Sequence, residues 1–483
     1  MKKLCCLLLC LFMVAALFAG CAKEPAESTD QEPGDSAVPA ESNEPAADEE
    51  VVLNLGIWPE DTLTEEIAMH EGFVATFQET HPNVEVVPNY YKYAVDTFVS
   101  LAEAGNQPTI FETWYTEPQK LIAAGYVADI TDELDARGWL DLINPNIREL
   151  LSADGRCYGI PRDAYVLGMM LNVSMFEEAG LVDENGYPDY PKTWEEVATK
   201  GKVIKDATGQ AAFCLLAADA AGGWHFSNIA WDFGATLCSM DADGKYVSDL
   251  NSPEAVAAME YVKSLKWEYD ILTPDPTVEN WGSGFTNLAA ETSAMYIAAG
   301  DAVNQPTENN GMPVEDLALI PMPAGPSGQY SLSGGTPYMF AKDASSEEIN
   351  AALDYLILMG KAPVVSDDAR AGLVADAEHK VEAGVPVIPR FPAWVIPEVV
   401  ELEQEVIDEY CNVDMNLYND YYEVIDKPGN IHPEEVGSTQ DMYTELTNVL
   451  QAVLTDESAD VQALMDEADA NYQALLDSTL NVQ

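Results

Sequence analysis

The chain from Val51 onward is predicted to have an α/β fold with two lobes. Strand-like and helix-like segments alternate there: VVLNLGIW at 51–58, a helical stretch ending near His81, VEVV at 84–87, a helix around 93–104, and TIFETW at 109–114. This βαβαβ order predicts a mostly parallel sheet. About 430 residues follow residue 50, and a chain of that length is expected to divide its core between two lobes.

Local signals position individual helices in this pattern. A Pro–Gly pair, Pro118 and Gly125, brackets one short helix, and the first helix has apolar residues on one face. The C-terminus predicts two amphipathic helices that pack against the body. The apolar faces comprise Ile67, Phe73, Val74 and Phe77 in the first helix, Leu446, Val449, Leu450, Val453 and Leu454 in the next, and Val461, Leu464, Met465, Ala468, Tyr472, Leu475 and Leu476 in the last.

The N-terminus has the features of a secretory signal. Two lysines precede an apolar run from Leu4 to Gly20, which is shorter than a membrane-spanning helix requires. The residues LFAGC ending at Cys21 resemble the lipobox of bacterial lipoproteins, which implies lipidation of Cys21, although Phe18 replaces the usual Leu. An uncleaved anchor and a plain secretory peptide remain alternatives. We therefore expect a signal peptide at 1–20, and an acidic disordered tether at 21–50, which is rich in Glu, Asp, Pro and Ser.

The composition limits the possible partners. The chain has 83 acidic and 22 basic residues, a formal charge of −61, which argues against binding to nucleic acid or to anionic lipid headgroups. Outside the signal and Cys21, four cysteines are scattered at 157, 214, 238 and 411 without metal-ligand spacing, so no metal or other cofactor is expected. A Cys214–Cys238 pair remains possible in an oxidising compartment.

Motifs for catalysis are not found. The sequence has no Gly-x-Ser-x-Gly elbow, no His-Glu-x-x-His pair and no phosphate-binding Gly-Lys-Ser/Thr, and its five histidines are not spaced as a helical metal pair. Acidic pairs at glycosidase spacing are bound to occur by chance among so many carboxylates. We expect a monomeric protein that is not an enzyme.

Four stretches in order resemble the family 1 extracellular solute-binding proteins of ABC importers, the group that includes the maltose-binding proteins. They are LIAAGYVADITDEL at 121–134, GRCYGIPRDAYVLGMMLNVSMFEEAGL at 155–181, PKTWEEV at 191–197, and TSAMYIAAGD at 292–301 followed by LIP at 319–321 and Gly334-Gly335. The resemblance implies a two-lobe periplasmic-binding-protein-like fold with a ligand cleft between the lobes. By analogy, lobe 1 comprises 51–160 and 326–375, and lobe 2 comprises 161–325 and 376–483 with the C-terminal helices.

Sugars require flat rings against their C–H faces and polar groups around their hydroxyls. In a parallel sheet such groups are expected just beyond the carboxyl ends of strands. Two pairs of candidate residues lie at the ends of predicted strands: Trp58 with Glu60, and Trp114 with Tyr115. Each could equally be a core residue.

Further candidates come from the resemblance and from local context. Arg162 and Asp163 match the segment of the family that lines the cleft, and Trp231 matches its second-lobe aromatic position; an interlobe salt bridge is the alternative for the first two. Trp281 lies in a Gly-bearing segment, as does Trp224. Asp301 is followed by Ala302 where relatives often have an aromatic residue, so that ring is either missing here or supplied elsewhere, with Trp281 and Trp394 as the candidates. The last candidates are Gly335, Arg390 and Trp394.

The sequence thus predicts an extracytoplasmic lipoprotein, held at the cell membrane by lipid alone, that binds a carbohydrate and delivers it to ABC permease subunits. Arg162 and Arg390 would suit an acidic sugar such as a uronic-acid oligosaccharide. The alternatives are another solute, such as a peptide, polyamine or metal chelate, a glycoside-acting enzyme, and a signalling co-receptor or adhesin of the same fold.

Overall fold

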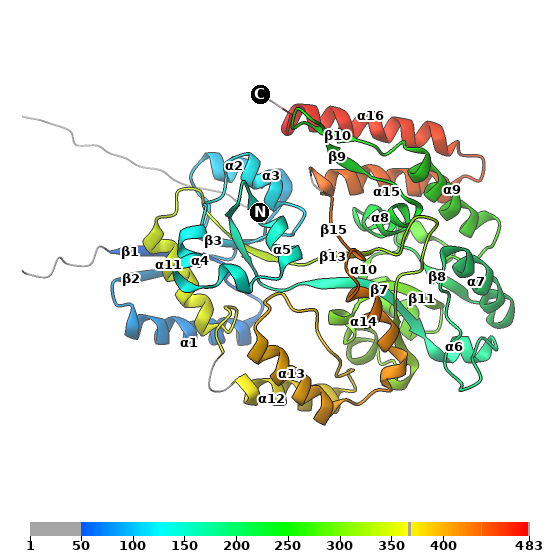
Figure 1. Ribbon diagram of the computed structural model, residues 1–483, viewed down its shortest axis with the longest axis horizontal. Helices are drawn as coiled ribbons and strands as arrows, with labels where there is room; N and C mark the ends of the chain where they lie inside the picture. Colours follow the sequence, from blue (N-terminus) through cyan, green and yellow to red (C-terminus); the bar gives the residue numbers. More distant parts are fainter. Residues whose placement is uncertain (1–49, 366–368, 436, 482–483) are drawn as a thin grey trace, which may run out of the picture. The chain divides into compact units, whose positions relative to one another are not determined.

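Lobe 1, on the left in Figure 1, is built on a five-stranded sheet with the order β2-β1-β3-β14-β6. The computed structural model describes residues 50–365, 369–435 and 437–481; the predicted signal peptide, Cys21 and the tether up to residue 49 lie outside them. The strands are β1 (Val51–Gly56), β2 (Val84–Pro88), β3 (Ile110–Glu112), β6 (Gly159–Pro161) and β14 (Pro337–Phe340). β1 pairs in parallel with β2 and β3, as predicted, whereas β14 is antiparallel to β3 and β6.

Six helices pack onto this sheet through one hydrophobic core. They are α1 (Thr64–Thr80), α2 (Val95–Glu103), α3 (Pro118–Ala123), α4 (Thr131–Arg137), α5 (Pro145–Leu150) and α11 (Ser346–Leu358). A short hairpin of β4 (Ser152–Ala153) and β5 (Arg156–Cys157) adjoins α5, and η1 (Leu140–Leu142) is a single turn. Pro118 begins α3, as the sequence predicts.

Lobe 2 is built on a second, mixed sheet with the order β15-β13-β7-β11-β8, in which β12 also pairs with β7. The strands are β7 (Tyr165–Asn172), β8 (Ala211–Cys214), β11 (Ser293–Ala299), β12 (Leu317–Ile320), β13 (Ser331–Gly334) and β15 (Ile431–Pro433). β7, β8, β11, β12 and β13 are almost wholly buried and read as continuous apolar or small-residue runs, as expected for strands covered on both faces. A separate hairpin joins β9 (Cys238–Met240) and β10 (Tyr246–Ser248).

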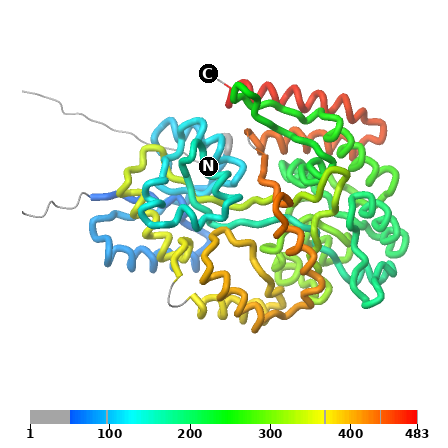
Figure 2. Tube along the Cα trace, in the orientation of Figure 1, coloured from blue at the N-terminus to red at the C-terminus, as the bar shows by residue number. Residues whose placement is uncertain are grey.

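The helices of lobe 2 include both predicted C-terminal helices. They are α6 (Val173–Glu178), α7 (Trp194–Thr208), α8 (Ala221–Phe233), α9 (Pro253–Trp267), α10 (Trp281–Ala289), α14 (Asn419–Ile425), α15 (Thr439–Thr455) and α16 (Val461–Thr479), with the short turns η2 (Pro276–Val278), η3 (Gly300–Ala302), η4 (Gln305–Asn309), η5 (Val314–Asp316) and η6 (Met415–Leu417). The predicted apolar faces of α15 and α16 enter the core of lobe 2. Figure 2 shows these helices, orange to red, lying along the green segments of that lobe.

The chain crosses between the lobes twice near the cleft. The first crossing, 162–164, joins β6 to β7, close to the predicted boundary at 160 and 161. The return crossing is Gly335–Thr336, between β13 and β14. The expected return at 326 is therefore too early, because β13 pairs with β7 and β15 in the sheet of lobe 2.

A helical hairpin, α12 (Ala369–Ala383) and α13 (Pro397–Tyr410), follows lobe 1 and has its own small core of Ala377, Val387 and Val406. Because it begins at 369, the expected boundary between lobes at 375 and 376 falls inside α12. The segment 385–395, which joins the two helices, contacts both lobes; we call it the strap. The cysteines at 157, 214, 238 and 411 are free, so the possible Cys214–Cys238 pair is not formed.

Candidate functional site

A cleft of about 600 Å³ lies between the lobes, where both crossings and the ends of several strands meet. This volume is within the range of small-molecule sites. Its wall contains side chains of lobe 1, of lobe 2 and of the crossings. They include Trp114, Arg162, Asp163, Tyr165, Trp224, Trp281, Asp301, Gly335, Thr336, Glu434, Gln440 and Tyr443.

Three indole rings line this cleft, one from lobe 1 and two from lobe 2. Trp114 follows β3, is 41% exposed and has its ring edge-on to Tyr93, with centroids 5.7 Å apart. Trp281 is 39% exposed and lies 5.6 Å from the ring of Trp224 in an edge-to-face arrangement. Large exposed rings are costly in water, so their gathering at one cleft marks a surface that binds apolar faces.

Local sequence explains the positions of the two lobe 2 rings. Trp281 is the first residue of α10, which Asn280 and Ser283 begin with a reciprocal capping box. Trp224 is on α8 directly after Gly223, where an added Cβ would lie 2.3 Å from the Tyr443 carbonyl oxygen of α15. The glycines before Trp224 thus permit close packing of two helices, and that packing sets the ring at the cleft.

The crossings supply a network of charged groups. The Arg162 guanidinium donates to Glu112 and to Asp163, each at 2.7 Å. Asp163 also accepts a hydrogen bond from the Thr336 backbone N–H at 2.9 Å, which ties the first crossing to the second. Gly335 has φ +143°, and a Cβ there would lie 2.7 Å from the Asp163 carbonyl oxygen, so only glycine fits this close approach.

Two further carboxylates face the same space. Partial loss of water at the cleft wall raises the pKa of Asp301 to about 6, although the residue is exposed by surface area, and the nearby charge of Asp163 adds to the effect. Burial also raises the pKa of Glu434, to about 8, although the Tyr443 hydroxyl donates to it at 3.0 Å. The Tyr165 hydroxyl lies among these groups: burial first, and then the charges of Glu434, Asp301 and Asp163, raise its pKa.

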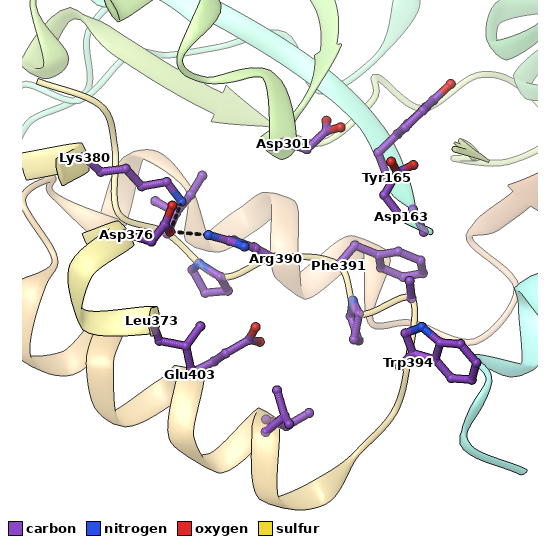
Figure 3. A pocket seen from close by; sticks show the side chains of 18 of the residues that line it. Asp163, Tyr165, Asp301, Leu373, Asp376, Lys380, Arg390, Phe391, Trp394 and Glu403 are labelled. Carbon is purple, nitrogen blue, oxygen red and sulfur yellow. Dashed lines mark hydrogen bonds and ion pairs between the residues drawn. The ribbon is translucent and has the colours of Figure 1, made fainter. Parts of the chain in front are cut away.

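A second cavity of about 860 Å³ adjoins the first and is bounded by the α12–α13 hairpin. Arg162, Asp163, Tyr165 and Asp301 line both spaces. Figure 3 shows Asp301, Tyr165 and Asp163 on one side of this cavity and the hairpin residues on the other. The hairpin side carries charged groups in contact, with Asp376 accepting from both Arg390 and Lys380.

The structure brings six of the predicted site residues to the 600 Å³ cleft: Trp114, Arg162, Asp163, Trp281, Asp301 and Gly335. Arg390 and Trp394 line the second cavity instead, where the Trp394 ring lies 6.3 Å from Trp139 of lobe 1. The two arginines proposed for an acidic sugar each contact carboxylates already.

The other predicted residues lie elsewhere. Trp231 requires a correction: it is 1% exposed, stacks on His432 at 3.8 Å and donates its indole N–H to Glu435, so it is a core residue of lobe 2 and presents no ring face to a solute. Tyr115 is buried beneath the crossings and donates to the Asp163 carbonyl oxygen. Neither Trp58, which packs on the core of lobe 1, nor the exposed Glu60 is among the residues of the two cavities described above.

Sequence reasoning missed several residues of the cleft. Tyr165, Glu434 and Gln440 line it without having been expected there. Tyr165 lies two residues after Asp163, so the crossing itself was a signal for it. Glu434 directly follows β15, and Gln440 is in the first turn of α15, both far along the chain. No local motif indicates that they reach the cleft.

Comparisons with known proteins establish the family and the fold of the chain. The family model for bacterial extracellular solute-binding proteins matches residues 61–362, so the chain belongs to that family. A binding protein of Brucella abortus (strain 2308) is 26% identical over 281 residues, which cover 57% of this chain and 64% of the relative. The alignment therefore spans less than two thirds of that relative's length.

Solved structures show the same two-lobe fold. The cyclic α-maltosyl-1,6-maltose binding protein from Arthrobacter globiformis matches with a TM-score of 0.62 at 20% identity, covering 89% of this chain and 99% of that one. UgpB from Mycobacterium tuberculosis, in complex with glycerophosphocholine, matches with a TM-score of 0.64 at 14% identity, covering 89% and 98%. At these identities the likeness establishes the fold.

Within the described ranges, no group of three or more His, Cys, Asp or Glu side chains could hold a metal ion. In the same part of the chain, no helix is long and apolar enough to cross a membrane.

Proposed function

We propose that this chain is a lipid-anchored extracytoplasmic protein that captures a carbohydrate in the interlobe cleft and delivers it to the permease of an ABC transporter. The proposal combines the family with the chemistry of the cleft. Cys21 after the apolar run Leu4–Gly20 supports export and lipidation, and the acidic segment up to residue 50 would serve as the tether.

One observation carries the carbohydrate assignment: indole rings from both lobes face one cleft whose remaining wall is polar. Trp114 of lobe 1 and the pair Trp224 and Trp281 of lobe 2 line one space together with carboxylates, an amide and hydroxyls. Rings of this kind stack on the C–H faces of a sugar, while Asp163, Asp301 and their neighbours can bond its hydroxyls. A purely apolar solute would leave these polar groups unpaired, at a cost in binding free energy.

The division of rings between lobes gives a mechanism of capture. A solute in contact with Trp114 and with Trp281 bridges lobe 1 and lobe 2, so it binds more tightly when the lobes are close together. This difference in affinity shifts the population toward the closed form. A permease that recognises the closed form would then be presented mainly with loaded protein.

Thermal unfolding of the chain from Val51 onward tests the assignment. The panel comprises neutral oligosaccharides, uronic-acid oligosaccharides, amino-sugar oligosaccharides, peptides, polyamines and glycerophosphocholine, the last because a structural neighbour is bound to it. We expect a saturable rise in Tm with a sugar class. A rise in Tm with peptides, polyamines or glycerophosphocholine, but with no sugar, would contradict the carbohydrate assignment. It would not affect the assignment of the chain to the solute-binding family.

A further inference from the structure

The charges that line the 600 Å³ cleft do not balance. Among the described residues of its wall, Arg162 is the only basic side chain, whereas Asp163, Asp301 and Glu434 are acidic. A solute-binding cleft with an excess of carboxylates favours a ligand that brings positive charge, because opposite charges attract more strongly where water is partly excluded.

The single guanidinium does not offset this excess. Arg162 binds Glu112 and Asp163 at 2.7 Å each, so two carboxylates already share its charge. Asp163 uses its other oxygen to accept the Thr336 N–H. The ion pairs at the crossings are therefore complete in themselves and leave the charge of Asp301 uncompensated. Glu434, whose pKa is about 8, holds a proton at pH 7 that a bound cation would favour releasing.

These two acids present unoccupied oxygens to the cleft. Glu434 is only 6% exposed, lines the cleft and accepts one hydrogen bond through Oε1, from Tyr443; within the described part of the chain, Oε2 receives none. Asp301 likewise accepts no side-chain hydrogen bond from another described residue. Burial raises the pKa of each carboxyl, which is the effect expected where a nearby positive charge is lacking.

The acids also share the cleft wall with the rings. Asp163, Asp301 and Glu434 come from three distant parts of the chain, yet all three line the cleft together with Tyr165, and their charges raise the pKa of its hydroxyl after burial. The Tyr165 ring is 6.4 Å from that of Trp224, which in turn lies against Trp281. A cation in this cleft would therefore have both carboxylates and aromatic rings among the groups of its wall, and both attract positive charge.

We propose that the solute is an amino sugar, whose protonated amino group binds at the acidic wall of the cleft, beside Asp301, while its rings stack on the indoles of the cleft. This inference rests on the proposed carbohydrate function and names its substrate class. The hydroxyl groups of the sugar bond to the remaining polar wall, and the amino group supplies the positive charge that the cleft lacks. Acidic sugars are disfavoured by the same charges.

Three disaccharides of one skeleton test the proposal by calorimetry at pH 7 on the purified protein: the glucosamine disaccharide, its N-acetylated form and cellobiose. They differ only at C2 of each ring, which carries an ammonium group, a neutral amide or a hydroxyl. We expect the amine to bind about tenfold more tightly than either neutral sugar, equivalent to about 1.4 kcal/mol. Asp301→Asn should remove that preference, while Glu260→Gln, which neutralises an exposed acid on α9, should retain it.

The outcomes separate this inference from the function on which it rests. Equal or tighter binding of a neutral sugar overturns the amino-sugar inference and supports carbohydrate capture. Binding of a diamine or of choline with no sugar bound supports a cation site and overturns both the amino sugar and the carbohydrate assignment. An amine preference that survives Asp301→Asn and Glu434→Gln alike overturns the proposed location of the cation.

Discussion

Replacement of Trp114 by Ala should weaken solute binding by about 70-fold. A Trp side chain presents up to about 250 Å², and 41% of this one is exposed, so about 100 Å² is free to contact a solute. At about 25 cal/mol per Å² this area corresponds to about 2.5 kcal/mol, which converts to the stated factor. Calorimetry with the sugar that gives the largest rise in Tm would measure the change.

A matched control separates stacking on the solute from a general effect of ring removal. Trp267 on α9 is 38% exposed, nearly as much as Trp114, but lies outside both cavities and donates its indole N–H to the Val453 carbonyl oxygen. Trp267→Ala should lower Tm without changing the affinity. If Trp114→Ala binds the sugar within threefold of the wild type, or if both variants lose affinity equally, the stacking argument is refuted.

Three further predictions concern the frame of the site. Trp231→Phe should leave affinity unchanged but lower the free energy of unfolding by about 1–3 kcal/mol, since the buried Glu435 loses its indole donor and keeps the longer hydrogen bond from the Leu237 N–H; denaturant unfolding measures this. Gly335→Ala should destabilise by at least about 1 kcal/mol, because φ is positive and the Cβ would contact Asp163; a normal Tm would contradict it. Burial raises the pKa of Glu434 to about 8, so the folded state binds a proton that the unfolded state releases. The associated stability is complete below the unfolded pKa and is lost as pH rises toward 8, and Glu434→Gln should flatten that decline in Tm.

The sequence was sufficient for the alternating elements, the C-terminal helices and the rings at strand and helix ends. Periodicity carries this information, because it depends on residues close together in the chain. The lobe boundary at 326 was misplaced because β13 is a short strand whose sheet is decided by partners far along the chain, in β7 and β15. Glu434 was missed for the same reason, since nothing near it in the sequence indicates which cavity it faces.

The two tryptophans of α8 show a limit of another kind. Trp224 and Trp231 are seven residues apart, so they lie on nearly the same face of one helix. One lines the cleft and the other is fully buried. Seven residues also separate them by about 10.5 Å along the axis, enough to pass from the cleft into the core. Helical periodicity predicts the face of a residue but not its depth, and depth decided the role of Trp231.

The strap explains why the rings, more than the acids, should control closure of the lobes. Both lobes donate hydrogen bonds to the strap. The Tyr422 hydroxyl of lobe 2 donates to the Pro389 carbonyl oxygen at 2.8 Å. The Asn144 side-chain amide of lobe 1 donates to the Pro392 carbonyl oxygen at 2.9 Å. So short a connection, together with the two crossings, limits relative movement near Asp301. Contacts that a solute makes there would be similar in open and closed forms and would raise the affinity of both.

Trp114 projects from lobe 1 after β3, whereas Trp281 begins α10 of lobe 2. A solute can contact both rings at once only when the lobes are close together. A ligand shifts an equilibrium only through its difference in affinity between the two states. On the proposed mechanism, the free energy for closure would therefore come chiefly from the indoles of the two lobes, while Asp301 and Glu434 would select the chemical class of solute.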